Sequence, residues 1–286
     1  MQFWVIQTLN SLALGGLLFL LASGFSLIFG LMRIANLTHG ALFMLGAYFG
    51  VTILKVVPNL WAAALLGGLA VAALGFFLER FILRKLAGNV LGQVLVTLGF
   101  AYIIADLCLL VWGGDPLPIP TPAFLQQPLR IAGFAFPAYR VAVVLVAFVV
   151  GALLYLFVEK TRLGAMIRAG VDDPQMARAV GIPVSRLSTI VFCLGAGLAG
   201  AGGIIGGPIM SAYPGLDADM LPLALIVVIL GGVGSLVGAF VGSFVTGFVY
   251  TFGVALRPEL AYVILFLPMI FVIAFRPRGL FGRFAA

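Results

Sequence analysis

Three polar residues, Asn36, Thr38 and His39, interrupt an apolar stretch near the start of the chain. Polar groups are costly inside a membrane, and where they occur there they mark candidate functional sites. They adjoin a predicted helix start after a break at Gly30–Arg33, so their side chains and the free N–H groups of that helix could bind a carboxylate. The alternative is that Asn36 and His39 only cap the helix or lie at the membrane interface.

A second candidate is the glycine-rich run between residues 231 and 235. Glycines at such a break would expose backbone groups, and irregular backbone is tolerated at membrane depth where it lines a cavity or is shielded by protein. The competing account is close packing against a neighbouring helix. The residues that could face a pathway here are Gly231, Gly232, Gly234 and Ser235.

Little else in the sequence could do chemistry. His39 is the single histidine, no H-E-x-x-H motif is present, and the chain holds no credible pair of nucleophile and base. Asp106 could bind an ammonium group or a proton, but it could equally lie near the outer surface. The sequence lacks a G-x-x-x-x-G-K-[ST] phosphate loop, so the chain cannot use ATP by that route. We expect neither an enzyme nor a resident cofactor or metal.

The elements that position these residues are hydrophobic helices. Of the 286 residues 63% are apolar and 9% are charged, whereas soluble domains carry roughly 25% charged residues. Long uncharged runs without strand-like alternation predict an all-α, polytopic transmembrane bundle. About eight membrane segments are expected, near residues 4–30, 40–56, 60–79, 88–112, 139–158, 188–209, 220–252 and 260–275.

The distribution of basic residues predicts the orientation of these segments. The net charge of +7 is better explained by Lys and Arg in cytoplasmic loops than by nucleic-acid binding. Basic residues cluster at positions 80–85, in the loop over residues 159–187 and in the C-terminal tail. Eight full crossings from an external N-terminus would leave the tail outside, so one segment must be miscounted. A half-helix at Gly30–Gly40 or at Gly231–Gly242 would resolve the conflict.

The loop over residues 159–187 carries its own helix signals. Asp173 suits an N-cap and Pro174 the first helical position, while Gly181 suits the left-handed residue that ends a helix. These signals predict a short helix over Pro174–Val180. Helices this short are marginal alone, so the helix must pack on its own protein, on lipid headgroups or in a groove of a partner. The residues predicted to share one apolar face are Met176, Ala177, Ala179 and Val180.

Several motifs together resemble a known family. They are the loop pattern Thr161, Gly164, Arg168-Ala169, Asp173-Pro174, Ala177, Gly181-Ile182; the run Ile34-Ala35-Asn36-Leu37-Thr38-His39-Gly40-Ala41 with Met44-Leu45-Gly46-Ala47-Tyr48; and Leu230-Gly231-Gly232-Val233-Gly234-Ser235 with Gly238-Ala239. Over nearly the whole chain this resembles the LivH-type permeases of bacterial ABC importers for branched-chain amino acids. One departure is Asp173, where the family is expected to have Asn, and both residues are good N-caps.

The resemblance implies one permease domain over residues 1–286 in a bacterial inner membrane, moving branched-chain amino acids. It implies a LivM-like second permease, two LivG/LivF-like ATPase subunits that use ATP and Mg, and a periplasmic or lipid-anchored binding protein. An ABC permease for urea or short amides and an ion-coupled secondary transporter remain as alternatives. The residues expected to couple the permease to the ATPases are Arg168, Asp173, Pro174, Met176, Ala177, Val180 and Gly181.

Overall fold

The computed structural model describes residues 2–33, 35–131 and 134–282, and apart from one short hairpin its regular structure is helical. The longer helices are α1 (Gln2–Met32), α3 (Leu60–Phe77), α4 (Val90–Trp112), α5 (Ala138–Lys160), α8 (Val184–Met210) and α10 (Leu236–Leu256). The shorter helices are α2 (Thr38–Leu54), α6 (Arg162–Asp172), α7 (Pro174–Ala179), α9 (Leu216–Gly231) and α11 (Ala261–Phe275). The predicted all-α fold is confirmed.

Short irregular elements connect these helices. A π-helical turn, η1 (Leu78–Ile82), and a 3-10 turn, η2 (Leu83–Leu86), continue α3 toward α4. The strands β1 (Pro128–Ile131) and β2 (Phe134–Pro137) form an antiparallel hairpin before α5. Two further 3-10 turns are η3 (Ala123–Leu125) and η4 (Pro258–Leu260).

Six helices of the described residues are long and apolar enough to cross a membrane, namely α1, α3 with its extension, α4, α5, α8 and α10. The predicted segment 220–252 is not one crossing, because α9 ends at Gly231 and α10 begins at Leu236. The count of about eight segments is therefore corrected by one additional helix. With this extra reversal the tail residues Arg276 and Arg278 lie at the same end as α6 and α7, and the conflict over the tail disappears.

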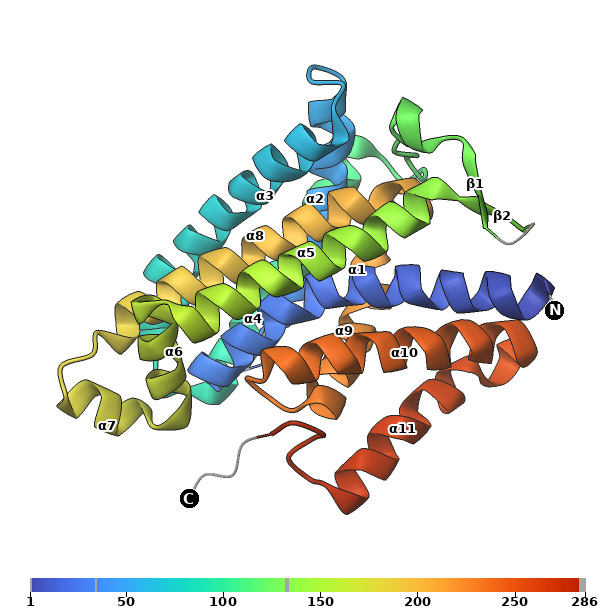
Figure 1. Cartoon of the computed structure of the whole chain (residues 1–286). Helices are drawn as coiled ribbons and strands as arrows, with labels where there is room; N and C mark the ends of the chain where they lie inside the picture. Colours follow the sequence, from blue (N-terminus) through green and yellow to red (C-terminus); the bar gives the residue numbers. More distant parts are fainter. Residues whose placement is uncertain (1, 34, 132–133, 283–286) are drawn as a thin grey trace.

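The interior of the bundle is formed by α1, α2 and α8 (Figure 1). Small residues allow these helices to approach closely: a Cβ atom added to Gly24 would lie 2.5 Å from the Cα atom of Gly195. A Cβ atom added to Gly203 would lie 2.0 Å from the carbonyl oxygen of Phe43. The glycine clusters of the sequence thus serve helix packing, as is typical of membrane proteins.

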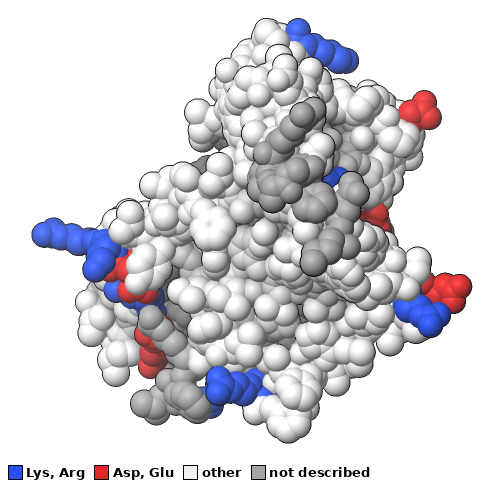
Figure 2. Space-filling view, turned by 45° about the vertical axis from the view of Figure 1, so that its right-hand side comes forward, with Lys and Arg blue, Asp and Glu red and all other residues white. Residues whose placement is uncertain are grey.

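The two ends of the bundle differ in charge. Figure 1 shows α6 and α7 at one end, which we call the loop end, and the N-terminus with β1 and β2 at the other, the hairpin end. Figure 2 shows charged side chains around the edges of one face, with a broad uncharged surface between them. The loop end carries Arg33, Arg80, Arg84, Lys85, Lys160, Arg162, Arg168, Arg178, Arg186, Arg276 and Arg278. By the positive-inside rule the loop end faces the cytoplasm.

Helix α2 begins inside the bundle instead of at its surface. The Nε2 atom of His39 lies 2.9 Å from the carbonyl oxygen of Leu21. Leu21 lies 11 residues before Met32, the end of α1, so α2 starts roughly 16 Å from the loop end at 1.5 Å per residue. The chain therefore re-enters the protein between Arg33 and Thr38. The interruption expected at Gly30–Gly40 is present, but α2 has 17 residues and spans about 25 Å, so it is not a half-helix.

Candidate functional site

The short helix α7 is built by caps at both ends. The Asp173 carboxylate accepts hydrogen bonds from the N–H groups of Gln175 (2.8 Å) and Met176 (3.0 Å), and these bonds lower the pKa of Asp173. At the other end Ile182 N–H donates to the Ala177 carbonyl and Gly181 N–H to that of Arg178. With Gly181 at φ +86° this is a Schellman motif. The predicted helix Pro174–Val180 is confirmed to within one residue, since Val180 is the C-cap.

The side chains of α7 point in two directions, and this corrects the predicted docking face. Ala177 is 3% exposed and packs into the core cluster that contains Val184 and Leu187. Met176 and Val180 are 61% and 68% exposed. A helix this short has space for only one residue on its inner side, so the spacing argument wrongly grouped Ala177 with its outward neighbours.

Helix α6, which precedes α7, packs against the end of α5. The Thr161 hydroxyl caps α6 by accepting from Gly164 N–H at 3.0 Å. A Cβ atom at Gly164 would lie 2.2 Å from the Val158 carbonyl oxygen, so only glycine fits there. Arg168 donates to the same Val158 carbonyl and pairs with Glu159 at 3.3 Å. Arg168 therefore braces the loop internally.

Arg33 is a loop contact that sequence reasoning missed. Its guanidinium lies 3.5 Å from the Val171 carbonyl oxygen and 3.4 Å from that of Asp172, the last residue of α6. A cation at the C-terminus of a helix stabilises the unpaired carbonyls there. Arg33 has φ +56°, which is uncommon for a residue other than glycine, and this backbone conformation was not visible in the sequence.

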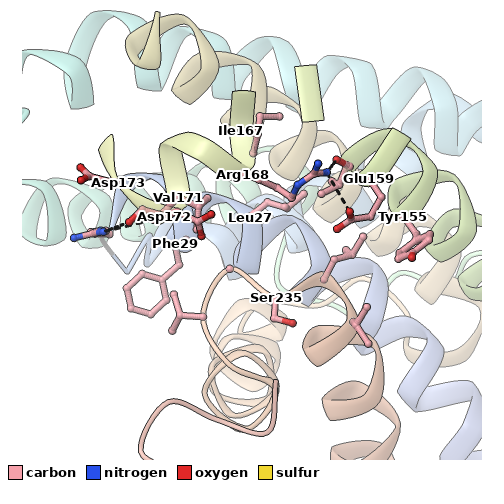
Figure 3. A pocket seen from close by; sticks show the side chains of 17 residues that line it. Leu27, Phe29, Tyr155, Glu159, Ile167, Arg168, Val171, Asp172, Asp173 and Ser235 are labelled. Atoms are coloured by element: carbon pink, nitrogen blue, oxygen red, sulfur yellow. Dashed lines mark hydrogen bonds and ion pairs between the residues drawn. The ribbon is translucent and has the colours of Figure 1, made fainter. Parts of the chain in front are cut away.

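A cavity of about 770 Å³ lies at the loop end between the ends of α1 and α5, helix α6 and the start of α10. In Figure 3 Arg168 and Glu159 face each other on one side, with Ser235 on another element. Among the predicted site residues the cavity brings together Arg168, Asp173, Gly234 and Ser235. Apolar side chains that include Leu27, Phe29, Leu236 and Val237 form much of the remaining wall. The coupling loop and the glycine break, predicted as separate sites, thus share one cavity.

The polar residues near the start of α2, predicted to face a pathway, lie outside this cavity. Asn36, Thr38 and His39 are each 0% exposed, and none lines this cavity. The Thr38 hydroxyl donates to the Thr97 carbonyl at 2.7 Å, and Asn36 Oδ1 accepts from Thr38 N–H at 3.2 Å. The His39 ring stacks on Phe25. These contacts fix the start of α2 against α1 and α4.

The glycine break also divides into two parts. Gly231 and Gly232 lie in close backbone packing: Phe281 N–H donates to the Gly231 carbonyl at 3.0 Å, and a Cβ atom at Gly232 would lie 2.6 Å from the N atom of Gly282. Gly234, at φ +76°, packs on Gly30. The Ser235 hydroxyl caps α10 by accepting from Gly238 N–H at 3.0 Å. The interruption expected at Gly231–Gly242 is confirmed, since it separates α9 from α10.

Asp106 does not belong to a site in the described structure. It lies on the exposed side of α4, six residues before the end of that helix at Trp112, and it does not line the loop-end cavity. Its position near the hairpin end agrees with the alternative of a residue close to the outer surface.

Comparison with known proteins identifies the class of this site. Residues 7–273 match the family model described as branched-chain amino acid transport system / permease component. The chain belongs to this family. The high-affinity branched-chain amino acid transport permease BraD of Pseudomonas aeruginosa is 28% identical over 97% of this chain and 95% of its own length. LivH of Escherichia coli (strain K12) is 26% identical over 98% and 96%. LivM of Salmonella typhimurium is 28% identical over 76% of this chain and 56% of its own length.

As a permease component of an ABC transport system, the chain is a multi-pass membrane protein and a transport subunit, not an enzyme. The loop contacts α1 through Arg33, α5 through Arg168 and α8 through Ala177.

Proposed function

We propose that this permease moves branched-chain or other hydrophobic amino acids into the cytoplasm as one half of a permease pair. Two ATPase subunits, which bind ATP and Mg, would supply the energy, and an external binding protein would deliver the substrate. A LivM-like chain is the second permease in this proposal, and the similarity of this chain to LivM supports a shared fold for the pair.

The observation that carries the proposal is the outward apolar face of α7. Met176 and Val180 are exposed on a helix that is capped at both ends and braced against its own protein on the opposite face. Exposed apolar side chains on a rigid short helix suit the helix-in-groove mode of recognition. In this proposal α7 lies in a groove of an ATPase subunit, and closure of the ATPase pair displaces α7 and switches the access of the pathway.

The test is co-purification of the tagged permease with candidate ABC ATPases of its own organism. The double variant Met176→Asp, Val180→Asp should lose the ATPases, because two carboxylates would have to be desolvated in the groove. Val56→Asp is the control, since Val56 is an even more exposed apolar residue (81%) at the hairpin end. Ala177 is unsuitable for this test because it is buried in the permease itself.

Retention of the ATPases by the double variant would contradict α7 as the docking element. Recovery of no ATPase by the wild-type chain would contradict ATP-driven transport as a whole. In that case uptake that persists without ATP and disappears with a proton uncoupler would support the ion-coupled alternative.

The substrate class is tested separately by uptake in proteoliposomes that hold the full complex. The apolar wall of the loop-end cavity, with Leu27, Phe29 and Leu236, favours an aliphatic side chain over urea or a short amide. Unlabelled leucine, isoleucine and valine should compete with labelled leucine, whereas urea in large excess should not. Competition by urea or acetamide alone would assign the transporter to the alternative substrate class.

A further inference from the structure

A buried carboxylate lies outside the coupling site described above. Glu79, on the π-helical turn η1, is 2% exposed and pairs with Arg84 on η2 at 3.2 Å. The Thr189 hydroxyl on α8 donates to the Glu79 Oε2 atom at 2.6 Å. The Arg84 side chain is 23% exposed, but its removal would leave the buried Glu79 carboxylate uncompensated, so these three side chains hold one another in a single arrangement.

The same cluster forms hydrogen bonds with the first two turns of α8. Arg84 Nη2 donates to the Ser185 carbonyl at 2.7 Å and also contacts the Thr189 hydroxyl. Helix α8 begins at Val184, directly after the Schellman turn that ends α7. The end of α3 is therefore attached to α8 immediately beyond the short helix α7.

The local backbone at Glu79 is specialised. Turns of π-helix are rare; they insert one extra residue into an α-helix and are frequently found at functional sites. Loss of that extra residue would rotate the following residues by about 100° relative to α3, and Arg84 would leave its place beside Glu79. The π turn therefore sets the register in which the carboxylate from η1 and the guanidinium from η2 meet α8.

Contacts between α3 and α8 extend from this cluster into the interior of the bundle. Helices α3 and α8 pack closely, since a Cβ atom at Gly75 would lie 2.7 Å from the Ala196 Cβ atom and one at Gly68 would lie 3.0 Å from the Gly197 carbonyl oxygen. A displacement at the start of α8 that also moves the end of α3 would reach the interior, where α8 contacts α2.

We propose that Glu79, Arg84 and Thr189 form a positioning clamp that makes α3 follow α7 and α8 when the coupling loop moves. The inference rests on the proposed ATP-driven function. An ion pair with a buried carboxylate contributes little to stability alone, because apolar residues of similar size often stabilise a protein as well or better. It is an effective device for geometry, because it fixes one relative position of two helices.

The decisive variant replaces both charges, Glu79→Met with Arg84→Met, in the reconstituted transporter with its ATPases and binding protein. We expect the complex to assemble and to keep its thermal midpoint, while transport per ATP hydrolysed falls about threefold to thirtyfold. Thr189→Val should give a smaller loss of the same kind, and Thr189→Ser should restore the wild-type ratio. Lys85→Met is the matched control, since Lys85 is an exposed cation on the same turn η2.

An unchanged ratio of transport to ATP hydrolysis in the double variant would overturn the clamp. A parallel fall in thermal midpoint and transport, with no change in the ratio, would also overturn it and leave a structural role. Failure of the proposed function gives a different result, because the wild-type chain would then bind no ATPase at all.

Discussion

The break before α2 and the break between α9 and α10 both interrupt the helical path, but they are built from different residues. The first is closed by polar side chains: Thr38, Asn36 and the Thr97 carbonyl pair with one another at full burial. The second is closed by glycine backbone, with Gly231 against Gly238 and Gly234 against Gly30. The first lies deep in the bundle and the second lies at the edge of the loop-end cavity.

This difference follows from the hydrogen-bond partners that are available to free backbone groups at each break. Deep in the bundle water is absent, so side chains must pair the backbone groups that the helix leaves free. At the loop end the chain can instead bring other backbone alongside, and close backbone contact requires residues without Cβ atoms. The deep break is thus sensitive to loss of a hydrogen bond, whereas the edge break is sensitive to added volume.

The largest effect is expected from Gly231→Ala. The new Cβ atom would lie 2.2 Å from the Gly238 carbonyl oxygen, and because both groups are backbone, α9 and α10 must separate. We expect a loss of about 3 kcal/mol or more, or failure to fold, measured by the thermal midpoint in detergent. Gly99→Ala is the control, since nothing lies within 4 Å of its Cβ position, and it should be neutral or slightly stabilising.

The next effect tests the deep break. Thr38→Val keeps the shape of the side chain but leaves the Thr97 carbonyl without the Thr38 donor inside the bundle. The expected cost is about 1–3 kcal/mol in the free energy of unfolding. Thr38→Ser retains the hydroxyl and should recover most of the lost free energy of unfolding. Equal stability of Thr38→Val and wild type would show that packing alone, without the hydrogen bond, holds α2 in place.

A smaller effect is expected at the cap of α10. Ser235→Ala removes the acceptor for Gly238 N–H, a loss of about 1 kcal/mol for an N-cap. Hydrogen exchange of the first turn of α10 should rise, while that of α2 stays at the wild-type rate. Ser235→Asp should restore protection. Faster exchange at both breaks would mean that they open together and are not independent.

The smallest effect concerns Asp173, which lines the same cavity as Ser235. Its pKa is lowered by two backbone N–H donors, so the cap contributes fully above the ordinary carboxyl pKa and is lost as pH falls through the lowered value. The protection factors of the α7 amides, which correct for the intrinsic pH dependence of exchange, should therefore fall only at acidic pH. Asp173→Asn should remove this pH dependence, and an unchanged acid response in that variant would assign it to another group.

The sequence predicts the local features of the site well, because they depend on neighbouring residues. The caps at Asp173 and Gly181, the break after Gly231 and the interrupted start of α2 all follow from residue types at short spacing. The direction of Ala177 could not be predicted, since it depends on how α6 tilts α7 against α8. Long-range contacts were also beyond reach: Arg33 meets α6 and Glu79 meets Thr189 across more than a hundred residues.

Glu79 shows why one of these contacts was missed. In the sequence it stands beside Arg80 and before Arg84 and Lys85, and the group is typical of a solvated cytoplasmic turn. Its burial arises from the π turn and from the position of α8, neither of which leaves a pattern in the sequence. The only sequence feature that could have indicated a buried carboxylate is the position of Glu79 at the end of an apolar segment.

The pairing of the tail with α9 has a consequence for the order in which the protein matures. The carbonyl groups of Leu230 and Gly231 accept from Leu280 and Phe281, which the ribosome adds only after α10 and α11. Until then the end of α9 lacks these partners, so the helical hairpin of α9 and α10 leaves the ribosome unfinished. A truncation placed before Leu280 would leave the carbonyl groups of Leu230 and Gly231 without these donors for the life of the protein.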